Sequence, residues 1–351
     1  MLSTNYGRKS MLHCVLLCAA IVATDTLAES PPTAEQPWRA LHVISYTTDE
    51  RLERLAQQLP QLGEMGINCL ILEVNYGFEF QSHPELRHGE RQITPAGAKR
   101  FLAACRENGI ELMPQFMCLG HQSWSRNTFP LLTKYPELDL TPGAFPNNED
   151  IYCREWDPMN PKTNEIVFAL IDELAGAFEA KAFHVGMDEV FLLSSEHAPS
   201  TKDRDPADVF AKVVNDLHGH IVKKRGLTML MWADRLIDGD RFEMGEWEAS
   251  KVGTAPAVDK IPKDIILCPW HYELREKYES LPMFLEKGFR ILPASWKKTD
   301  ATLALIRDAR ANQRDGRVVG HIFTTWSQRR ESWTEFEPLV KGLEELRRSE
   351  K

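Results

Sequence analysis

Hydrophobic positions along the chain form short, nearly continuous apolar runs separated by longer stretches with helical spacing. Such runs are typical of strands covered on both faces. They fall at residues 41–45, 68–74, 110–116, 182–187, 227–232, 264–269, 290–293 and 318–325. Turn residues and amphipathic spacing predict helices over residues 48–63, 95–108, 161–178, 206–225, 280–287, 300–312 and 336–348.

Eight predicted strands that alternate with helices indicate the α/β class and a (β/α)8 TIM barrel. A doubly wound open sheet is less consistent with the sequence, because no glycine-rich phosphate loop follows the first strand. We therefore predict one barrel domain over residues 39–351. Two segments break the alternation: a long loop at about 119–157, and a charged stretch at 240–263 that we interpret as an inserted loop.

The first 28 residues resemble a secretory signal peptide. Arg8 and Lys9 precede an apolar run over 11–23, and Thr26-Leu27-Ala28 places small residues at the two positions that a signal peptidase requires. The apolar run is too short for a comfortable membrane span. The sequence thus predicts an exported protein, extracellular or periplasmic, with a flexible lead-in at 29–38 and no membrane span.

Charge and cysteine content exclude some functions. The formal net charge of −9 over 351 residues argues against a nucleic-acid partner. Of the seven cysteines two lie in the signal segment, and the remaining five cannot all pair within one chain. Cys118 and Cys153 lie in predicted loops and could form a disulfide. Since the cysteines lack zinc-site spacing, we predict neither a metal nor a cofactor.

Acidic and aromatic residues follow the predicted strands where they end. Asp188 and Glu189 come directly after the fourth strand, and His121 lies just beyond the third. Because the carboxyl ends of barrel strands converge on one face, we expect these side chains to form a site. Aromatic rings can stack on a pyranose while carboxylates handle protons. The aromatic residues at strand ends are Trp232, Trp270, Tyr272, Trp296 and Trp326.

The segment that carries the acidic pair, residues 184–190 (His-Val-Gly-Met-Asp-Glu-Val), resembles the His-x-Gly-Gly-Asp-Glu-Val signature of family 20 glycoside hydrolases, the β-N-acetylhexosaminidases. Residues 109–115 and 119–121 are similar to the family's third strand and its Pro-Gly-His turn. Residues 157–183, 230–232 and 326–327 resemble further segments of the family. These matches extend from about residue 39 to residue 333.

The resemblance implies a retaining glycosidase that cleaves N-acetylated amino sugars from a glycan, with the substrate's acetamido group as nucleophile. Glu189 would be the general acid and base, and Asp188 would orient the acetamido group. Tyr272 would hydrogen-bond its oxygen. His121 would support the acid pair, although a structural histidine is equally compatible with its position. Trp232, Trp270 and Trp326 would form the walls of the pocket.

Several positions depart from the family pattern. Met187 replaces the second glycine, the first strand lacks an arginine that grips the terminal sugar, and Gln115 and Gln328 replace glutamates. These departures leave open a second interpretation, a carbohydrate-binding barrel with reduced turnover. A metal-dependent hydrolase that uses His184 and Asp188 is a third and weaker one, because four residues along a strand separate the two side chains widely.

Overall fold

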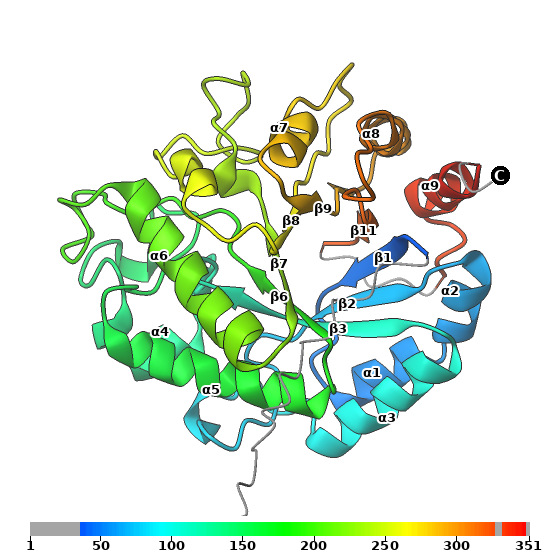
Figure 1. Cartoon of the computed structure of the whole chain (residues 1–351). Helices are drawn as coiled ribbons and strands as arrows, with labels where there is room; N and C mark the ends of the chain where they lie inside the picture. The colour runs from blue at the N-terminus through cyan, green and yellow to red at the C-terminus, as the bar shows by residue number, and fades with distance from the viewer. Residues whose placement is uncertain (1–35, 327–331, 349–351) are drawn as a thin grey trace, which may run out of the picture. The chain divides into compact units, whose positions relative to one another are not determined.

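Parallel strands form the centre of the molecule (Figure 1). The structure is a computed structural model, and it describes residues 36–326 and 332–348. The order of the strands in the sheet is β10-β11-β1-β2-β3-β6-β7-β8-β9. Their bounds are β1 (Trp38–Val43), β2 (Cys69–Glu73), β3 (Glu111–Cys118), β6 (Ala182–Gly186), β7 (Thr228–Trp232), β8 (Ile266–Cys268), β9 (Arg290–Ile291), β10 (Ala294–Ser295) and β11 (Gly320–Thr324).

The two ends of this sheet are halves of one extended segment, which closes the barrel. Between β9 and β10, the amide of Leu292 donates to Leu267 O over 2.9 Å on one side. The amide of Ile322 donates to Pro293 O over 2.8 Å on the other side. Since Pro293 has no N–H, the ladder is interrupted there and the strand divides in two. Counted as one, β9 and β10 complete the predicted eight-stranded barrel, which is confirmed.

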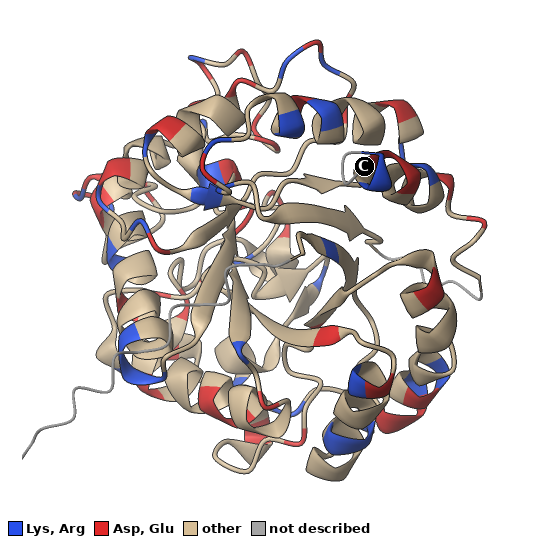
Figure 2. Ribbon diagram, turned by 45° about the vertical axis from the view of Figure 1, so that its right-hand side comes forward, with Lys and Arg blue, Asp and Glu red and all other residues tan. Residues whose placement is uncertain are grey.

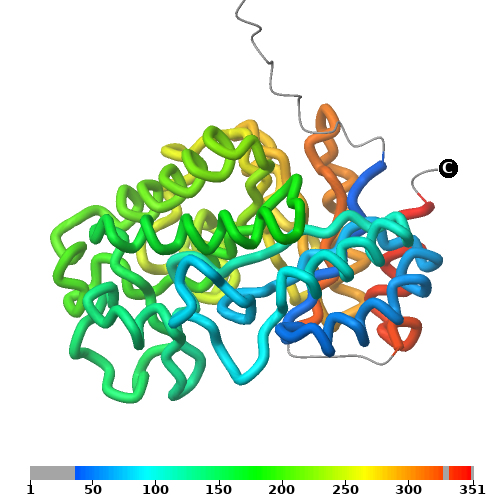
Figure 3. Tube along the Cα trace, turned by 90° about the horizontal axis from the view of Figure 1, so that it is seen from below, coloured from blue at the N-terminus to red at the C-terminus, as the bar shows by residue number. Residues whose placement is uncertain are grey.

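Helices surround the barrel, and acidic and basic residues are interspersed along them (Figure 2). Trp333 Nε1 donates to Gln58 Oε1 over 2.6 Å, and α9 lies between α8 and α2, so that it completes the ring of helices (Figure 1, Figure 3). The helices are α1 (Asp49–Ala56), α2 (Leu59–Met65), α3 (Pro95–Glu107), α4 (Pro130–Lys134), α5 (Pro161–Ala177), α6 (Pro206–His218), α7 (Ser280–Glu286), α8 (Thr299–Ala311) and α9 (Glu337–Arg347). No helix in the described ranges is long and apolar enough to cross a membrane.

The helix predicted over 48–63 is in fact two helices. Pro60 lacks the amide that would bond the carbonyl of Ala56, so the helix stops and restarts as α2. The predicted helix over 206–225 ends in a π-helical turn, η4 (Gly219–Lys224). The long loop after β3 contains a small hairpin of β4 (Ser123–Trp124) and β5 (Asn127–Thr128) in addition to α4.

The suggested disulfide is wrong, because Cys118 and Cys153 are both free and buried. The signal segment 1–28 and most of the lead-in lie outside the described residues, as does Gln328.

Two apolar layers stabilise the barrel. Alternate strand residues point outward against the helices, and the others fill the barrel. The interior layer consists of Ala40, Cys69, Ile71, Met113, Ala182, Leu230, Trp232, Ile266, Cys268, Trp270, Leu292, Ala294 and Ile322. Two residues further along their strands, the same interior positions hold His42, Glu73, Gln115 and His184. The barrel interior therefore becomes polar toward the carboxyl ends of the strands.

Candidate active site

A left-handed turn at the end of β6 presents the two adjacent acids. Gly186, Met187 and Glu189 have φ values of 68°, 77° and 52°. A Cβ at Gly186 would lie 2.7 Å from Met117 Sδ, so only glycine fits there. Met187 is fully buried, and its side chain packs in the outer apolar layer. The bulkier residue that replaces the family glycine therefore does not fill the site.

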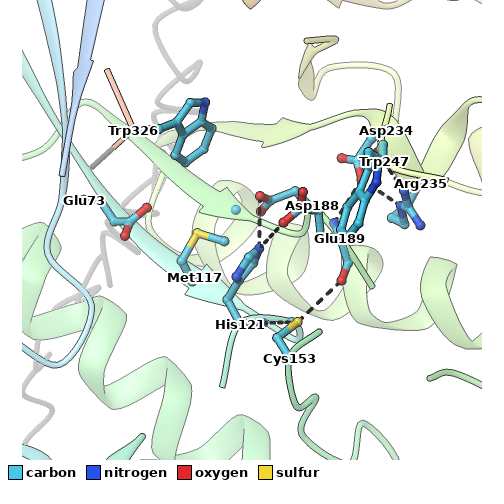
Figure 4. A network of polar contacts seen from close by, with 12 residues as sticks. Glu73, Met117, His121, Cys153, Asp188, Glu189, Asp234, Arg235, Trp247 and Trp326 are labelled. Atoms are coloured by element: carbon cyan, nitrogen blue, oxygen red, sulfur yellow. Dashed lines mark hydrogen bonds and ion pairs between the residues drawn. The ribbon is translucent and has the colours of Figure 1, made fainter. Parts of the chain in front are cut away.

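His121 joins the two acids (Figure 4). Its Nε2 lies 3.3 Å from Asp188 Oδ2 and 3.1 Å from Glu189 Oε2. Burial opposes a charge on His121, but the Asp188 carboxylate and the neighbouring Cys153 and Glu189 outweigh burial and raise the pKa of His121 well above its usual range. The histidine is thus a cation that compensates two carboxylates, and it is not available as a base at neutral pH.

Two further carboxylates hold the backbone of the acidic segment. The amide of Glu189 donates to Asp234 Oδ2 over 2.9 Å. The amides of Phe191 and Leu192 donate to Glu155 Oε1 over 2.6 and 2.7 Å. Burial raises the pKa of Asp234 to about 6 and that of Glu155 to about 7, although these hydrogen bonds and Arg235 oppose the shift. The acids are therefore positioned by acceptors from other loops.

Arg235 is fully buried and connects this support to the inserted loop. Its Nε donates to Asp234 Oδ2 over 2.7 Å. Its Nη2 donates to the carbonyls of Glu246, Trp247 and Ala249 over 2.5, 2.9 and 2.9 Å. One guanidinium thus fixes both the acid-bearing segment and the loop that carries Trp247.

The aromatic residues predicted at strand ends do come together. Trp270 stacks on Tyr272, with ring centroids 4.9 Å apart and an interplanar angle of 26°. The Tyr272 hydroxyl accepts a hydrogen bond of 2.6 Å from Trp326 Nε1. Trp232 is fully buried in the barrel, 5.8 Å from the Trp326 ring. Trp296 lies 5.5 Å from Tyr272. These rings form one wall beside the acid pair.

A second group of rings lies on the outer side of Glu189, and the sequence did not identify it. Tyr152 is 4.8 Å from Trp247, 5.7 Å from Trp124 and 5.8 Å from His121. The indoles of Trp124 and Trp247 remain 55% and 45% exposed. Exposed rings grouped around an acid form a surface on which a ligand can stack.

Glu248 fixes the residues behind Tyr272. Its carboxylate accepts from the Tyr272 amide over 3.4 Å and from Arg275 over 3.3 Å, and it lies 3.0 Å from His271 Nδ1. Burial alone would raise the pKa of Glu248, but the hydrogen bond from His271 and the charge of Arg275 lower it. The inserted loop thus supports both the acids and the aromatic wall.

Among the described residues, His121, Asp188 and Glu189 form the group whose ligand atoms lie close enough to hold a metal, within 4.8 Å of one another. The predicted alternative partner, His184, is not among them. Its ring packs 4.5 Å from Trp232, and its Nδ1 accepts from the Gly186 amide over 3.1 Å. The metal interpretation based on His184 and Asp188 therefore lacks the necessary geometry.

A groove of about 490 Å³ lies elsewhere, beside α1. Both arginines that line it are paired: Arg100 lies 3.4 Å from Asp49 and 3.3 Å from Glu53, and Arg91 lies 3.6 Å from Glu50. None of the described residues that line this groove has a buried polar atom without a hydrogen-bond partner, unlike the acid site.

Comparison with known proteins identifies the family of the chain. The model of the glycosyl hydrolase family 20 catalytic domain matches residues 56–338. The chain belongs to glycosyl hydrolase family 20. The family predicted from the residues around Asp188 is therefore confirmed, as is the barrel that this family is expected to have.

Sequence identity to individual family 20 proteins is low. The chain is 23% identical over 304 residues to a lacto-N-biosidase of Bifidobacterium bifidum, covering 83% of this chain and 24% of that protein. It is 25% identical over 292 residues to a β-hexosaminidase of Emericella nidulans, covering 74% and 43%. A chitobiase structure from Flavobacterium johnsoniae superposes with a TM-score of 0.66 at 18% identity, covering 89% of this chain and 50% of that one. The chain thus spans half or less of these relatives.

Removal of the Arg235 charge tests the support of the family 20 site. Arg235→Met leaves Asp234 buried without its cation and frees three loop carbonyls, so we expect the free energy of unfolding to fall by about 3–5 kcal/mol. Urea denaturation measures the change. The control is Arg241→Met, at an exposed position of the same loop, which is expected to change stability by less than about 0.5 kcal/mol. Equal effects of the two variants would contradict a supporting role of Arg235.

Proposed function

We propose that this family 20 chain is a retaining, β-N-acetylhexosaminidase-like glycosidase in which the substrate's 2-acetamido group acts as nucleophile. The acetamido oxygen attacks the anomeric carbon while the bond to the leaving oxygen breaks. An oxazolinium-like intermediate results. Water then attacks the same carbon, the ring of the intermediate opens, and the acetamido group is restored.

The state of Asp188 carries this proposal. Its Oδ2 is engaged by His121, while its Oδ1 is buried and has no hydrogen-bond partner. A buried carboxylate oxygen without a partner is costly unless a ligand supplies the donor. The N–H of an acetamido group is such a donor, and the carboxylate also stabilises the positive charge that develops on this group. Tyr272, whose oxygen is fixed by Trp326, lies in the adjoining wall and would donate to the acetamido oxygen.

Glu189 would serve as acid and then as base. It lies beside the cationic His121, which can balance the charge of the pair as the Glu189 proton leaves and returns. Its backbone is fixed by the Asp234 acceptor, so the carboxyl group keeps one position through both steps. No metal or cofactor enters this scheme.

Trp124, Tyr152 and Trp247 surround the outer side of the acid, where the leaving group would depart. We infer that these rings stack on a sugar in the leaving group, so that the substrate is a glycan ending in an N-acetylhexosamine.

Export from the cytoplasm also remains our proposal, and the basic, apolar and small-residue segments of residues 1–28 support it. Its test is separate from that of the chemistry.

Substitution of the acid pair tests the mechanism. Glu189→Gln is expected to lower kcat/KM for an aryl 2-acetamido-2-deoxy-β-glucoside by about 10²–10⁴, and Asp188→Asn by about 10²–10³. The exposed Glu196→Gln is the matched control and should leave the rate unchanged. The wild type should not measurably cleave the aryl glucoside that lacks the acetamido group. Equal rates on both glycosides would exclude substrate assistance, and activity absent throughout would favour a binding barrel.

Removal of the Trp247 ring tests the leaving-group side. Trp247→Ala should lower kcat/KM about tenfold for a disaccharide of two N-acetylhexosamines, because stacking contributes about 1.4 kcal/mol. The corresponding methyl glycoside, which has no second sugar, should be cleaved at an unchanged rate. A loss of the same size for both substrates would place Trp247 in a general structural role.

Mass spectrometry of the exported protein tests the signal segment. The protein is produced with its own N-terminus in a host that has a general secretion pathway. It should appear outside the cytoplasm, with the mass of a chain whose first residue is Glu29. A full-length chain retained in the cytoplasm would contradict export.

A further inference from the structure

Glu73 is a buried acid that the proposed reaction does not use. It ends β2 on the interior side, with 17% of its side chain exposed. Its Oε1 accepts from Asn75 Nδ2 over 2.9 Å, and its Oε2 accepts from Gln115 Nε2 over 3.0 Å. Both donors are neutral amides, so no direct hydrogen bond from a cation compensates this carboxylate.

Titratable groups around Glu73 do not neutralise it fully. Burial raises the pKa of Glu73 to about 7; the His121 charge opposes this shift and the Asp188 charge adds to it. His42 Nε2 is 3.9 Å away, but burial lowers the pKa of His42 to about 4, so this ring is neutral. A carboxylate that is buried at a cost in stability, near the acid pair, is a candidate for a ligand contact.

Unsatisfied polar atoms surround Glu73. In register with it on β3, Gln115 has a buried Oε1 without a hydrogen-bond partner. His42, on β1, lies against Gln115, and neither of its buried ring nitrogens makes a hydrogen bond of good geometry. This corner of the barrel therefore offers a carboxylate, an amide oxygen and an imidazole to a ligand with several hydroxyl groups.

The position of Glu73 indicates which hydroxyl groups those are. Figure 4 shows Glu73 across His121 and Asp188 from Trp247, away from the leaving-group side. In the proposed reaction Glu189 faces the anomeric oxygen, and Asp188 with Tyr272 faces the 2-acetamido group. The β1–β3 corner then adjoins the remaining ring positions, which carry the 3- and 4-hydroxyl groups.

We propose that Glu73 and Gln115 bind the 3- and 4-hydroxyl groups of the terminal hexosamine and thereby contribute to recognition of this sugar. This inference rests on the proposed function for its orientation of the sugar. The Glu73 carboxylate accepts a charge-assisted hydrogen bond from one hydroxyl group, and the unpartnered Gln115 Oε1 accepts from its neighbour. Glu73 is a specificity residue and takes no part in bond breaking.

A cycle of variants and substrates tests this proposal. Wild type and Glu73→Gln are assayed on the aryl 2-acetamido-2-deoxy-β-glucoside and on its 3-deoxy and 4-deoxy analogues. The wild type should lose about ten- to a hundredfold in kcat/KM on the analogue that lacks the hydroxyl group bound by Glu73, and a smaller factor on the analogue that lacks the hydroxyl group bound by the neutral Gln115. On the parent substrate, the kcat/KM of Glu73→Gln should be lower than that of the wild type by a factor similar to the one for the hydroxyl group bound by Glu73. The variant should lose little more when this hydroxyl group is absent from the substrate. If Glu73→Gln lowers kcat/KM by the same factor relative to the wild type on all three substrates, the proposal is overturned.

Glu111→Gln is the matched control, since Glu111 lies at the opposite end of β3, 3.3 Å from Trp38 Nε1. This variant should retain the wild-type preference between parent and deoxy substrates. If the wild type cleaves none of these glycosides, the proposed function fails. Calorimetry of N-acetylglucosamine and its deoxy analogues with the wild type and Glu73→Gln then tests the contact alone, and an unchanged affinity difference would overturn it.

Stability against pH separates ligand binding from a role in the fold. The folded-state pKa of Glu73 is raised, so its contribution to stability is greatest when the carboxyl is protonated and falls as pH rises from about 4.5 to 7. Glu73→Gln removes the loss of stability that occurs when the Glu73 carboxyl ionises. The introduced amide brings an N–H group, and rotation of the Gln115 amide would provide an acceptor for it. Its unfolding equilibrium constant should be lower than wild type by up to about a hundredfold at pH 8 and equal at pH 4. Destabilisation at both pH values would assign Glu73 to the fold and overturn the proposal.

Discussion

The pairing of His121 with Asp188 and Glu189 is the interaction on which the site depends. Two adjacent carboxylates at a mostly buried position repel each other and lose solvation, so they require a nearby cation. His121 Nε2 lies within 3.3 Å of an oxygen of each. A single imidazole thus contacts both carboxyl groups of the pair, and a carboxylate held beside the substrate can stabilise the positive charge that the reaction develops.

Support for this cluster comes from outside its own strand. Asp234 and Glu155 accept the backbone amides of residues 189, 191 and 192. Buried carboxylates with raised pKa values are costly, and Arg235 compensates one of them. Since Arg235 also binds three carbonyls of the loop around Trp247, the acids and the exposed aromatic surface are held together. We infer that the inserted loop is an integral part of the site.

The sequence predicted most of the barrel and the inner half of the site for one physical reason. Buried parallel strands are apolar throughout, so their ends are visible, and residues at those ends converge. This placed His121 and the acid pair together with Trp232, Trp270, Tyr272 and Trp326. The predicted helix over 48–63 and the seventh predicted strand were each divided in two at a proline, Pro60 or Pro293, which lacks the amide that would continue the element.

The outer half of the site was not predictable in the same way. Tyr152 and Trp247 lie in long loops whose course is set by the buried side chains of other segments, and no local period encodes such contacts. Glu73 did leave a signal, an acid inside an otherwise apolar run, but a strand position alone does not show what the side chain meets.

Met187 shows how a departure from the family pattern can leave the geometry of the site intact. Its φ of 77° lies in the region that glycine adopts without steric cost, and a side chain there costs about 1–3 kcal/mol. Complete burial of the methionine in the outer layer offsets part of this cost. The fold thus retains the left-handed turn that presents Asp188 and Glu189, although the residue that most easily adopts it has been lost. Backbone strain of this kind is expected where the turn must orient the two carboxyl groups, even at a cost in stability.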